Sequence, residues 1–319
     1  MALLNAARRK WAILIAAVAI CIIASEVISI KVLGLGDPPL SIADPEIEYL
    51  FAPNQQVMRF GNRITFNSYS MRSPEFPPKK SPTETLRLLV VGDSVVNGGS
   101  LTDDDRLATS ILQHKLAPAG VSVVGNISAG SWGPPNHLAY LTRFGTFDAD
   151  VIVFVYSSHD YFDVPTFTPL DPTTHPTVKP RFATLEGIQR YLPRYVPGAG
   201  SKTTDENIDA PRTNAAEQLK QVLALAQSTG ADVYLLQHLE REELVRGIPK
   251  PGHHEIQELA RNLNIPTTTT EKWMTELGLA KAFRDNIHPN DLGQKALANA
   301  LLDLIEPSLN KAESTTLLQ

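Results

Sequence analysis

The chain has almost no cysteine. Its single cysteine, Cys21, lies within an apolar stretch near the N-terminus. A framework of intrachain disulfides is therefore excluded. Because the rest of the chain contains no cysteine, the sequence is compatible with an oxidising compartment without requiring one.

An excess of basic residues is also missing. The 319 residues include 29 Lys and Arg against 34 Asp and Glu, which gives a formal net charge of −5. This balance provides no reason to expect a nucleic-acid partner. No internal repeat is apparent, and the length is sufficient for one large domain or two small ones.

Charge is absent from one N-terminal stretch, Trp11 to Ser25, which follows Arg8-Arg9-Lys10. A basic segment before an apolar one is typical of an export signal. We expect a cytoplasmic N-terminus at residues 1–10, and an uncleaved transmembrane anchor over 11–35 in preference to a cleaved signal. The basic residues place the following domain on the extracytoplasmic side, in the periplasm or at the cell surface. Glu26 argues against a span that includes it, because a carboxylate is costly in lipid.

The residues between this segment and the first strong strand are punctuated by proline. We expect residues 36–85 to form an approach segment that packs on the domain, with one edge strand near 64–70. The chain then alternates between apolar strands and helical segments. Five strands are expected, near 86–91, 121–124, 151–156, 232–237 and 265–270. This alternation predicts an α/β fold with a mostly parallel five-stranded sheet and helices on both faces.

Two further segments interrupt or end this pattern. Residues 161–212 are rich in proline and carry several aromatic side chains. They are expected to form an insertion or a lid over a substrate cleft, because long connections without periodicity are often functional. Residues 308–319 are expected to form a tail.

The strand near 86–91 leads into Gly92-Asp93-Ser94. A strand that ends in a tight turn and a helix would place Ser94 at the carboxyl edge of the sheet, where open α/β sheets bind their ligands. Ser94 is therefore a candidate nucleophile. The alternative interpretation is an ordinary helix start in which the serine only caps the helix.

The end of the chain provides a matching pair, Asp285 and His288, ahead of the last helix. A serine hydroxyl needs a base to accept its proton, and the base needs a third group to fix its tautomer. An aspartate three residues before a histidine can form that pair within one turn. Taken alone, the pattern fits better with the start of a helix, in which Asn290 caps the helix and Asp285 is a solvated charge.

Taken together, Gly92-Asp93-Ser94 and Asp285-x-x-His288 resemble the first and last motifs of the SGNH hydrolases, also called GDSL-type esterases. The resemblance extends over a domain at residues 86–307 and implies a three-layer α/β/α, flavodoxin-like fold. It also implies that Ser94 is the nucleophile, that His288 is the general base and acid, and that Asp285 orients His288. The stretch Asn67 to Glu75 resembles a segment of membrane-tethered members of this family.

The middle motifs depart from the family pattern. The second motif usually has a glycine at the position of Ser131, and Gly130 precedes it here. The third motif usually has an asparagine at the position of His159. The resemblance implies an oxyanion hole formed by the backbone N–H groups of Ser94 and of Gly130 or Ser131, together with the His159 side chain. The alternative for His159 is a structural role.

The expected function is ester hydrolysis through an acyl-serine, as in an esterase or deacetylase, at the extracytoplasmic face of a membrane. No metal and no organic cofactor are expected. The substrate would be an ester or an acylated glycan, and protein partners cannot be identified. Two alternatives stay open: an O-acyltransferase that modifies an exported polysaccharide, and a non-catalytic glycan-binding scaffold of the same fold.

Overall fold

The computed structural model describes residues 2–81, 84, 86–119, 121–192 and 212–316. At its centre is a five-stranded sheet with the strand order β6-β5-β7-β8-β9, in which all neighbours are parallel. The strands are β5 (Leu86–Gly92), β6 (Val121–Ser128), β7 (Val151–Ser157), β8 (Asp232–His238) and β9 (Thr267–Thr269). The five strands expected from the sequence are confirmed.

The sheet is buried on both faces, which explains its apolar strands. Successive side chains of a strand point to opposite faces. In β5, Leu89 and Val91 therefore join one core, and Leu88 and Val90 join the other. A strand with both faces covered has no polar side, as is usual in parallel sheets.

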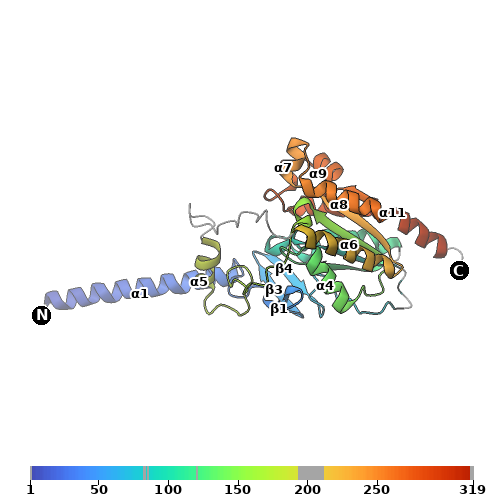
Figure 1. The fold of residues 1–319 in the computed structure, drawn as a ribbon. Coiled ribbons are helices and arrows are strands. Elements are labelled where there is room, and N and C mark those ends of the chain that lie inside the picture. The colour runs from blue at the N-terminus through green and yellow to red at the C-terminus, as the bar shows by residue number, and fades with distance from the viewer. Residues whose placement is uncertain (1, 82–83, 85, 120, 193–211, 317–319) are drawn as a thin grey trace.

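Helices cover both faces (Figure 1). The core on one face includes side chains of α4 (Pro134–Phe144), α6 (Arg212–Ser228) and α8 (Pro251–Asn262). The core on the other includes side chains of α3 (Ala108–Leu116), α9 (Glu271–Leu277) and α11 (Asp291–Thr316). The three-layer arrangement is confirmed, and the strand order is that of flavodoxin-like sheets. In such sheets the order reverses beside the first strand, here β5, and ligands bind at that point.

The last helix is longer than expected. The sequence predicts a tail over residues 308–319, but α11 continues to Thr316, with Pro307 inside it. Leu304 and Ile305, in the helical turn just before Pro307, are buried in the core and hold this part of α11 in place. Proline removes one backbone donor, but the residues that follow it include good helix formers, so the helix continues.

The N-terminal helix α1 (Ala2–Lys31) extends away from the rest of the molecule (Figure 1). Its segment Arg8–Lys31 is long and apolar enough to cross a membrane. Large apolar side chains along it, such as Trp11 and Ile20, are exposed. The expected apolar helix is therefore present.

The approach segment is more ordered than the sequence indicates. It forms two antiparallel hairpins: β1 (Ser41–Asp44) with β2 (Glu48–Phe51), and β3 (Gln55–Arg59) with β4 (Asn62–Phe66). The β3–β4 turn has positive φ at both Phe60 and Gly61. Such turns usually carry Asn-Gly, so a Phe-Gly pair gives little signal in the sequence.

Short helices complete the fold. They are α2 (Ser94–Asn97), α5 (Ala183–Glu186), α7 (Arg241–Arg246) and α10 (Leu279–Ala282). Helix α5 belongs to the insertion and continues as a π-helical turn over Gly187–Tyr191. Residues 193–211 of the insertion lie outside the described residues.

Candidate active site

Ser94 is the first residue of α2, directly after β5. The side chain of Asp93 caps this short helix by accepting the N–H of Val95 at 2.8 Å. The Asn97 amide donates to the backbone oxygen of Ser128 at 2.9 Å, which ties the end of α2 to the end of β6. The contacts of Asp93 at the start of α2 and of Asn97 at its end therefore fix Ser94 at the carboxyl edge of the sheet.

Gly92 is required for a different reason from the one expected. A glycine that follows a strand and begins a tight turn often has a positive φ, but Gly92 does not. A Cβ atom placed there would lie 2.6 Å from Cγ2 of Val96 and 3.1 Å from the backbone oxygen of Val155. The glycine lets α2 pack closely against the sheet.

Asp285 and His288 occupy a turn between α10 and α11. Oδ1 of Asp285 accepts the backbone N–H groups of Ile287 and His288, at 2.9 and 2.7 Å. Its Oδ2 lies 2.8 Å from Nδ1 of His288. Burial raises the pKa of Asp285, but the hydrogen bonds from His288 and Ile287 outweigh it and hold this pKa below its ordinary value. The carboxylate therefore stays ionised and accepts a hydrogen bond from the Nδ1–H group of His288.

This turn brings His288 to Ser94, 194 positions away in the sequence, with Nε2 2.9 Å from the serine Oγ. With the ring proton on Nδ1, the unprotonated Nε2 faces the serine hydroxyl. The three residues singled out from the two ends of the domain thus form one chain of hydrogen bonds.

Gly130 and Ser131 follow β6 in a tight loop, where the Trp132 N–H donates to the Ala129 oxygen at 3.5 Å. The Tyr49 hydroxyl donates to the backbone oxygen of Gly130 at 2.6 Å and fixes that peptide. Ser94 and Gly130 both line a cavity of about 180 Å³, here called the small cavity. Among the residues that the structure describes, its lining includes neither Ser131 nor His159.

Ser131 has φ +59°, in the left-handed region that favours glycine. The family's glycine at this position thus has a conformational reason. We expect Ser131→Gly to raise the free energy of unfolding by about 1 kcal/mol, because a Cβ in this region costs about 1–2 kcal/mol. Chemical unfolding followed by tryptophan fluorescence measures the change. Ser131→Ala keeps the Cβ and serves as the control; an equal gain in both variants would contradict the explanation.

His159 lies in a short 3₁₀ turn after β7 and faces acidic side chains. Its Nε2 is 3.6 Å from Asp93 Oδ2 and 3.7 Å from Asp160 Oδ1, and its Nδ1 is 3.6 Å from Glu240 Oε1. Burial lowers the pKa of His159, but the carboxylates of Asp160, Asp93 and Glu240 together raise it well above its ordinary value. The imidazolium thus sits among buried carboxylates, next to the residue that caps α2.

In the described part of the chain, one group brings three possible metal ligands within 4.8 Å of one another: Asp93, His159 and Asp160. A metal needs a neutral imidazole. The raised pKa of His159 favours the cation, whereas burial and the neighbouring Asp93 raise the pKa of Asp160 well above its ordinary value. The protonated imidazole that the surrounding carboxylates favour is not the form that binds a metal.

His137, in α4, is fully buried beneath β5 and β7. One ring nitrogen lies 3.1 Å from the backbone oxygen of Gly92, and the other lies 3.0 Å from the Tyr156 hydroxyl. A carbonyl can only accept, so Nε2 carries the proton and Nδ1 accepts from the tyrosine. The neutral ring satisfies both partners, and burial lowers the pKa of His137 to about 4.

This depressed pKa predicts acid sensitivity. An unfolded histidine binds a proton near pH 6.5, so His137 contributes its stability above that pH and loses it as the pH falls towards 4. We expect the wild type to lose about 2 kcal/mol more of its free energy of unfolding between pH 8 and pH 5 than His137→Gln. Glutamine retains a donor and an acceptor but does not titrate. Equal losses in the two proteins would exclude His137 as the titrating group.

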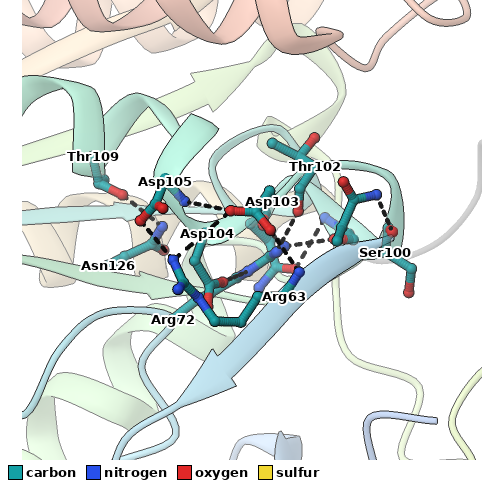
Figure 2. A network of polar contacts seen from close by, with 12 residues as sticks. Arg63, Arg72, Ser100, Thr102, Asp103, Asp104, Asp105, Thr109 and Asn126 are labelled. Carbon is teal, nitrogen blue, oxygen red and sulfur yellow. Dashed lines mark hydrogen bonds and ion pairs between the residues drawn. The ribbon is translucent and has the colours of Figure 1, made fainter. Parts of the chain in front are cut away.

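Arg72 positions the loop that follows α2, and its role could not be predicted from the sequence. Its Nη1 donates to the backbone oxygens of Asn97 and Gly99, and its Nη2 donates to that of Thr102 at 2.6 Å. Its Nε lies 3.2 Å from Oδ1 of Asp104. Figure 2 shows the guanidinium enclosed by this loop and by the acidic residues around Asp104. Arg72 lies within the stretch 67–75 that resembles a family segment, but that resemblance does not indicate which backbone oxygens the arginine binds.

No family model and no curated protein matches the sequence. Several solved structures are similar to the chain. A two-domain esterase active on acetylated mannans is 13% identical with a TM-score of 0.44; the match covers 71% of this chain and 49% of that one, so this chain spans about half its length. The psychrotrophic esterase EstA from Pseudoalteromonas sp. is 13% identical, with a TM-score of 0.43. The match covers 70% of this chain and 98% of EstA. A family 3 carbohydrate esterase from Clostridium thermocellum is 13% identical, with a TM-score of 0.44. The match covers 71% of this chain and 98% of that esterase.

Proposed function

We propose that the chain is a serine-dependent ester hydrolase of the SGNH type, acting through an acyl-serine. The observation that carries this proposal is the hydrogen-bonded series from Ser94 Oγ through His288 to Asp285, with steps of 2.9 and 2.8 Å. Nucleophile, base and orienting carboxylate stand in the order that serine catalysis requires.

The proposed reaction has two halves. Ser94 Oγ attacks the ester carbonyl carbon while its proton passes to Nε2 of His288. The bond to the alcohol oxygen then breaks, and His288 returns the proton to that oxygen, which leaves an acyl-serine and a free alcohol. Water repeats the sequence from the same side and releases the acid. These steps need only the three side chains and a stabilised oxyanion, so no metal or organic cofactor takes part in the proposal.

In this proposal, backbone N–H groups near Ser94 stabilise the oxyanion that forms when the serine attacks the ester carbonyl. Ser94 begins α2, so its N–H has no partner within the helix. Gly130 lines the same small cavity. The Tyr49 hydroxyl donates to the backbone oxygen of Gly130 and so fixes the peptide that carries the N–H of Ser131. Fixed donors of this kind are what an oxyanion hole requires. A contribution from Ser131 or His159 remains a prediction; the ring nitrogens of His159 face carboxylates, which favours a positioning role through Asp93.

We further propose that α1 anchors the protein in a membrane with the catalytic domain on the extracytoplasmic side. The length and apolar character of Arg8–Lys31 support the anchor. Arg8, Arg9 and Lys10 at its N-terminal end support a cytoplasmic N-terminus, because basic residues are retained on that side.

Labelling with a fluorophosphonate probe tests the enzymatic proposal. We expect the full chain in detergent to react with the probe, and Ser94→Ala and His288→Ala to stay unlabelled. Mass spectrometry of the labelled peptide should place the adduct on Ser94. A folded wild-type protein that does not react, or a Ser94→Ala variant that still does, would overturn the assignment.

A further inference from the structure

The catalytic residues line two cavities that differ in size. The small cavity, of about 180 Å³, is lined by Ser94 and Gly130. A second cavity, of about 910 Å³ and here called the large cavity, is lined by Asp285 and His288 but not by Ser94. The large cavity is within the range of roughly 300–1,000 Å³ that holds an organic ligand. The small cavity has room for only a short group.

The proposed reaction assigns the two halves of an ester to these cavities. The carbonyl carbon must lie at Ser94 with its oxygen near the Gly130 loop, so the acyl group extends into the small cavity. His288 must protonate the departing alcohol oxygen, so the alcohol lies on the His288 side. The alcohol portion of the substrate therefore extends into the large cavity.

Outside the catalytic pair, the walls of the large cavity combine apolar side chains with polar ones, which include Arg190 and Arg284. The apolar side chains come from the linker after α1, from the β3–β4 turn, from the loop after α2, and from the insertion: Leu33, Leu35, Phe60, Leu101, Ile188 and Leu192. The apolar part of this lining suits a hydrocarbon chain, because contact with it removes apolar surface from water.

One wall of the large cavity is the end of the helix that could cross a membrane. Ser29 of α1 and Leu33 just beyond it both line the cavity. The carboxylate of Glu26 accepts the backbone N–H groups of Ala183 and Thr184, at 2.7 and 2.9 Å. This contact fixes α5 beside the end of α1, as Figure 1 shows. Glu26, which is unfavourable within lipid, thus marks where α1 meets the domain.

The segment around α5 exposes large apolar side chains. Phe182 and Ile188 are 60% and 52% exposed, and Leu185 and Leu192 are 43% and 50% exposed. Exposed apolar residues gathered in one segment indicate a binding or membrane-contacting surface. Since this segment is attached to α1, its apolar side chains would lie at the membrane surface, next to the large cavity.

We infer that the substrate is an amphiphilic ester of the bilayer, with a short acyl group that occupies the small cavity and an apolar alcohol chain that enters the large cavity from the membrane beside α1. The inference rests on the proposed function and adds the substrate class and its orientation.

Two constitutional isomers, decyl acetate and ethyl decanoate, test the orientation, with ethyl acetate as a short reference. The full chain is reconstituted in phosphatidylcholine vesicles, and kcat/KM is measured for each ester. Decyl acetate is expected to exceed both other esters by at least about tenfold, because burial of two methylene groups suffices for that factor. A preference for ethyl decanoate would overturn the orientation. Equal values for decyl acetate and ethyl acetate would show that the large cavity holds no chain.

A matched pair of variants tests the site. Ile188→Asp places a carboxylate in the large cavity, whereas Ile248→Asp makes the same change at an isoleucine that is 68% exposed elsewhere. We expect Ile188→Asp to lower the preference for decyl acetate over ethyl acetate about tenfold, and Ile248→Asp to leave it unchanged. An equal effect of both variants on this preference would contradict the assignment of the alcohol chain to the large cavity. Failure to hydrolyse any ester, with Ser94 unlabelled by the fluorophosphonate, would instead overturn the proposed function and this inference with it.

Discussion

Replacing His288 with alanine is expected to lower kcat for ester hydrolysis by about 10⁴- to 10⁶-fold, the largest effect of any single change outside Ser94. The imidazole is the group within hydrogen-bonding distance of Ser94 Oγ that can accept its proton, at 2.9 Å. Without it the hydroxyl must ionise unaided. Steady-state hydrolysis of an activated acetyl ester by the full chain in detergent measures the loss.

His254→Ala is the matched control, because His254 is exposed on α8 and lines none of the cavities described above. It should retain wild-type activity. Asp285→Asn provides an intermediate case: its amide can donate to Nδ1 and so favour the wrong tautomer of His288. We expect a smaller loss than for His288→Ala. Wild-type activity in His288→Ala would show that another base serves Ser94.

Replacing Arg72 with methionine is expected to lower the free energy of unfolding by about 3–5 kcal/mol. Arg72 is 1% exposed, and its guanidinium supplies donors to three backbone oxygens after α2 and to Asp104. Methionine fills similar space but leaves these acceptors without a donor, and each unsatisfied buried group costs about 1–3 kcal/mol. Chemical unfolding at pH 7 measures the change.

Arg63→Met is the control for this variant. Arg63 also pairs with Asp104, and in addition with Asp103 and Asp105, as Figure 2 shows. Its side chain, however, is 38% exposed. Exposed ion pairs contribute about 0–1 kcal/mol, so the loss should stay below about 1 kcal/mol. Similar losses in both variants would contradict the distinction between a buried and a half-exposed guanidinium.

The sequence predicts a structural feature best where a single physical requirement determines the residue type at a position. The sheet strands could be predicted because burial on both faces requires unbroken apolar runs, as in β7. Ser94, Asp285 and His288 could be singled out because each lies beside a recognisable turn. Their mutual distances could not be predicted, since they depend on how α10, α11 and β5 pack.

Other features left no such signal. Arg72 and His137 bind backbone oxygens, and every residue in the chain offers such an acceptor, so no sequence pattern marks the partner. The β3–β4 hairpin was missed because Phe60 adopts a conformation usually taken by asparagine or glycine. Of the carboxylates around His159, those of Asp93 and Glu240 come from other loops and become its neighbours only in the folded chain.

The contacts of Glu186 in α5 have a consequence for the order of folding. Its carboxylate accepts the backbone N–H of Gly36 at 2.6 Å and binds the fully buried Arg59 at 2.5 Å, across sequence separations of 150 and 127 residues. The β3–β4 hairpin is synthesised early, but its buried arginine has no counter-charge until α5 has been made and docked. Contacts this distant in sequence form slowly, because the entropy of closing the loop must be overcome first. We therefore expect the segment nearest the N-terminal helix to be among the last to reach its native packing.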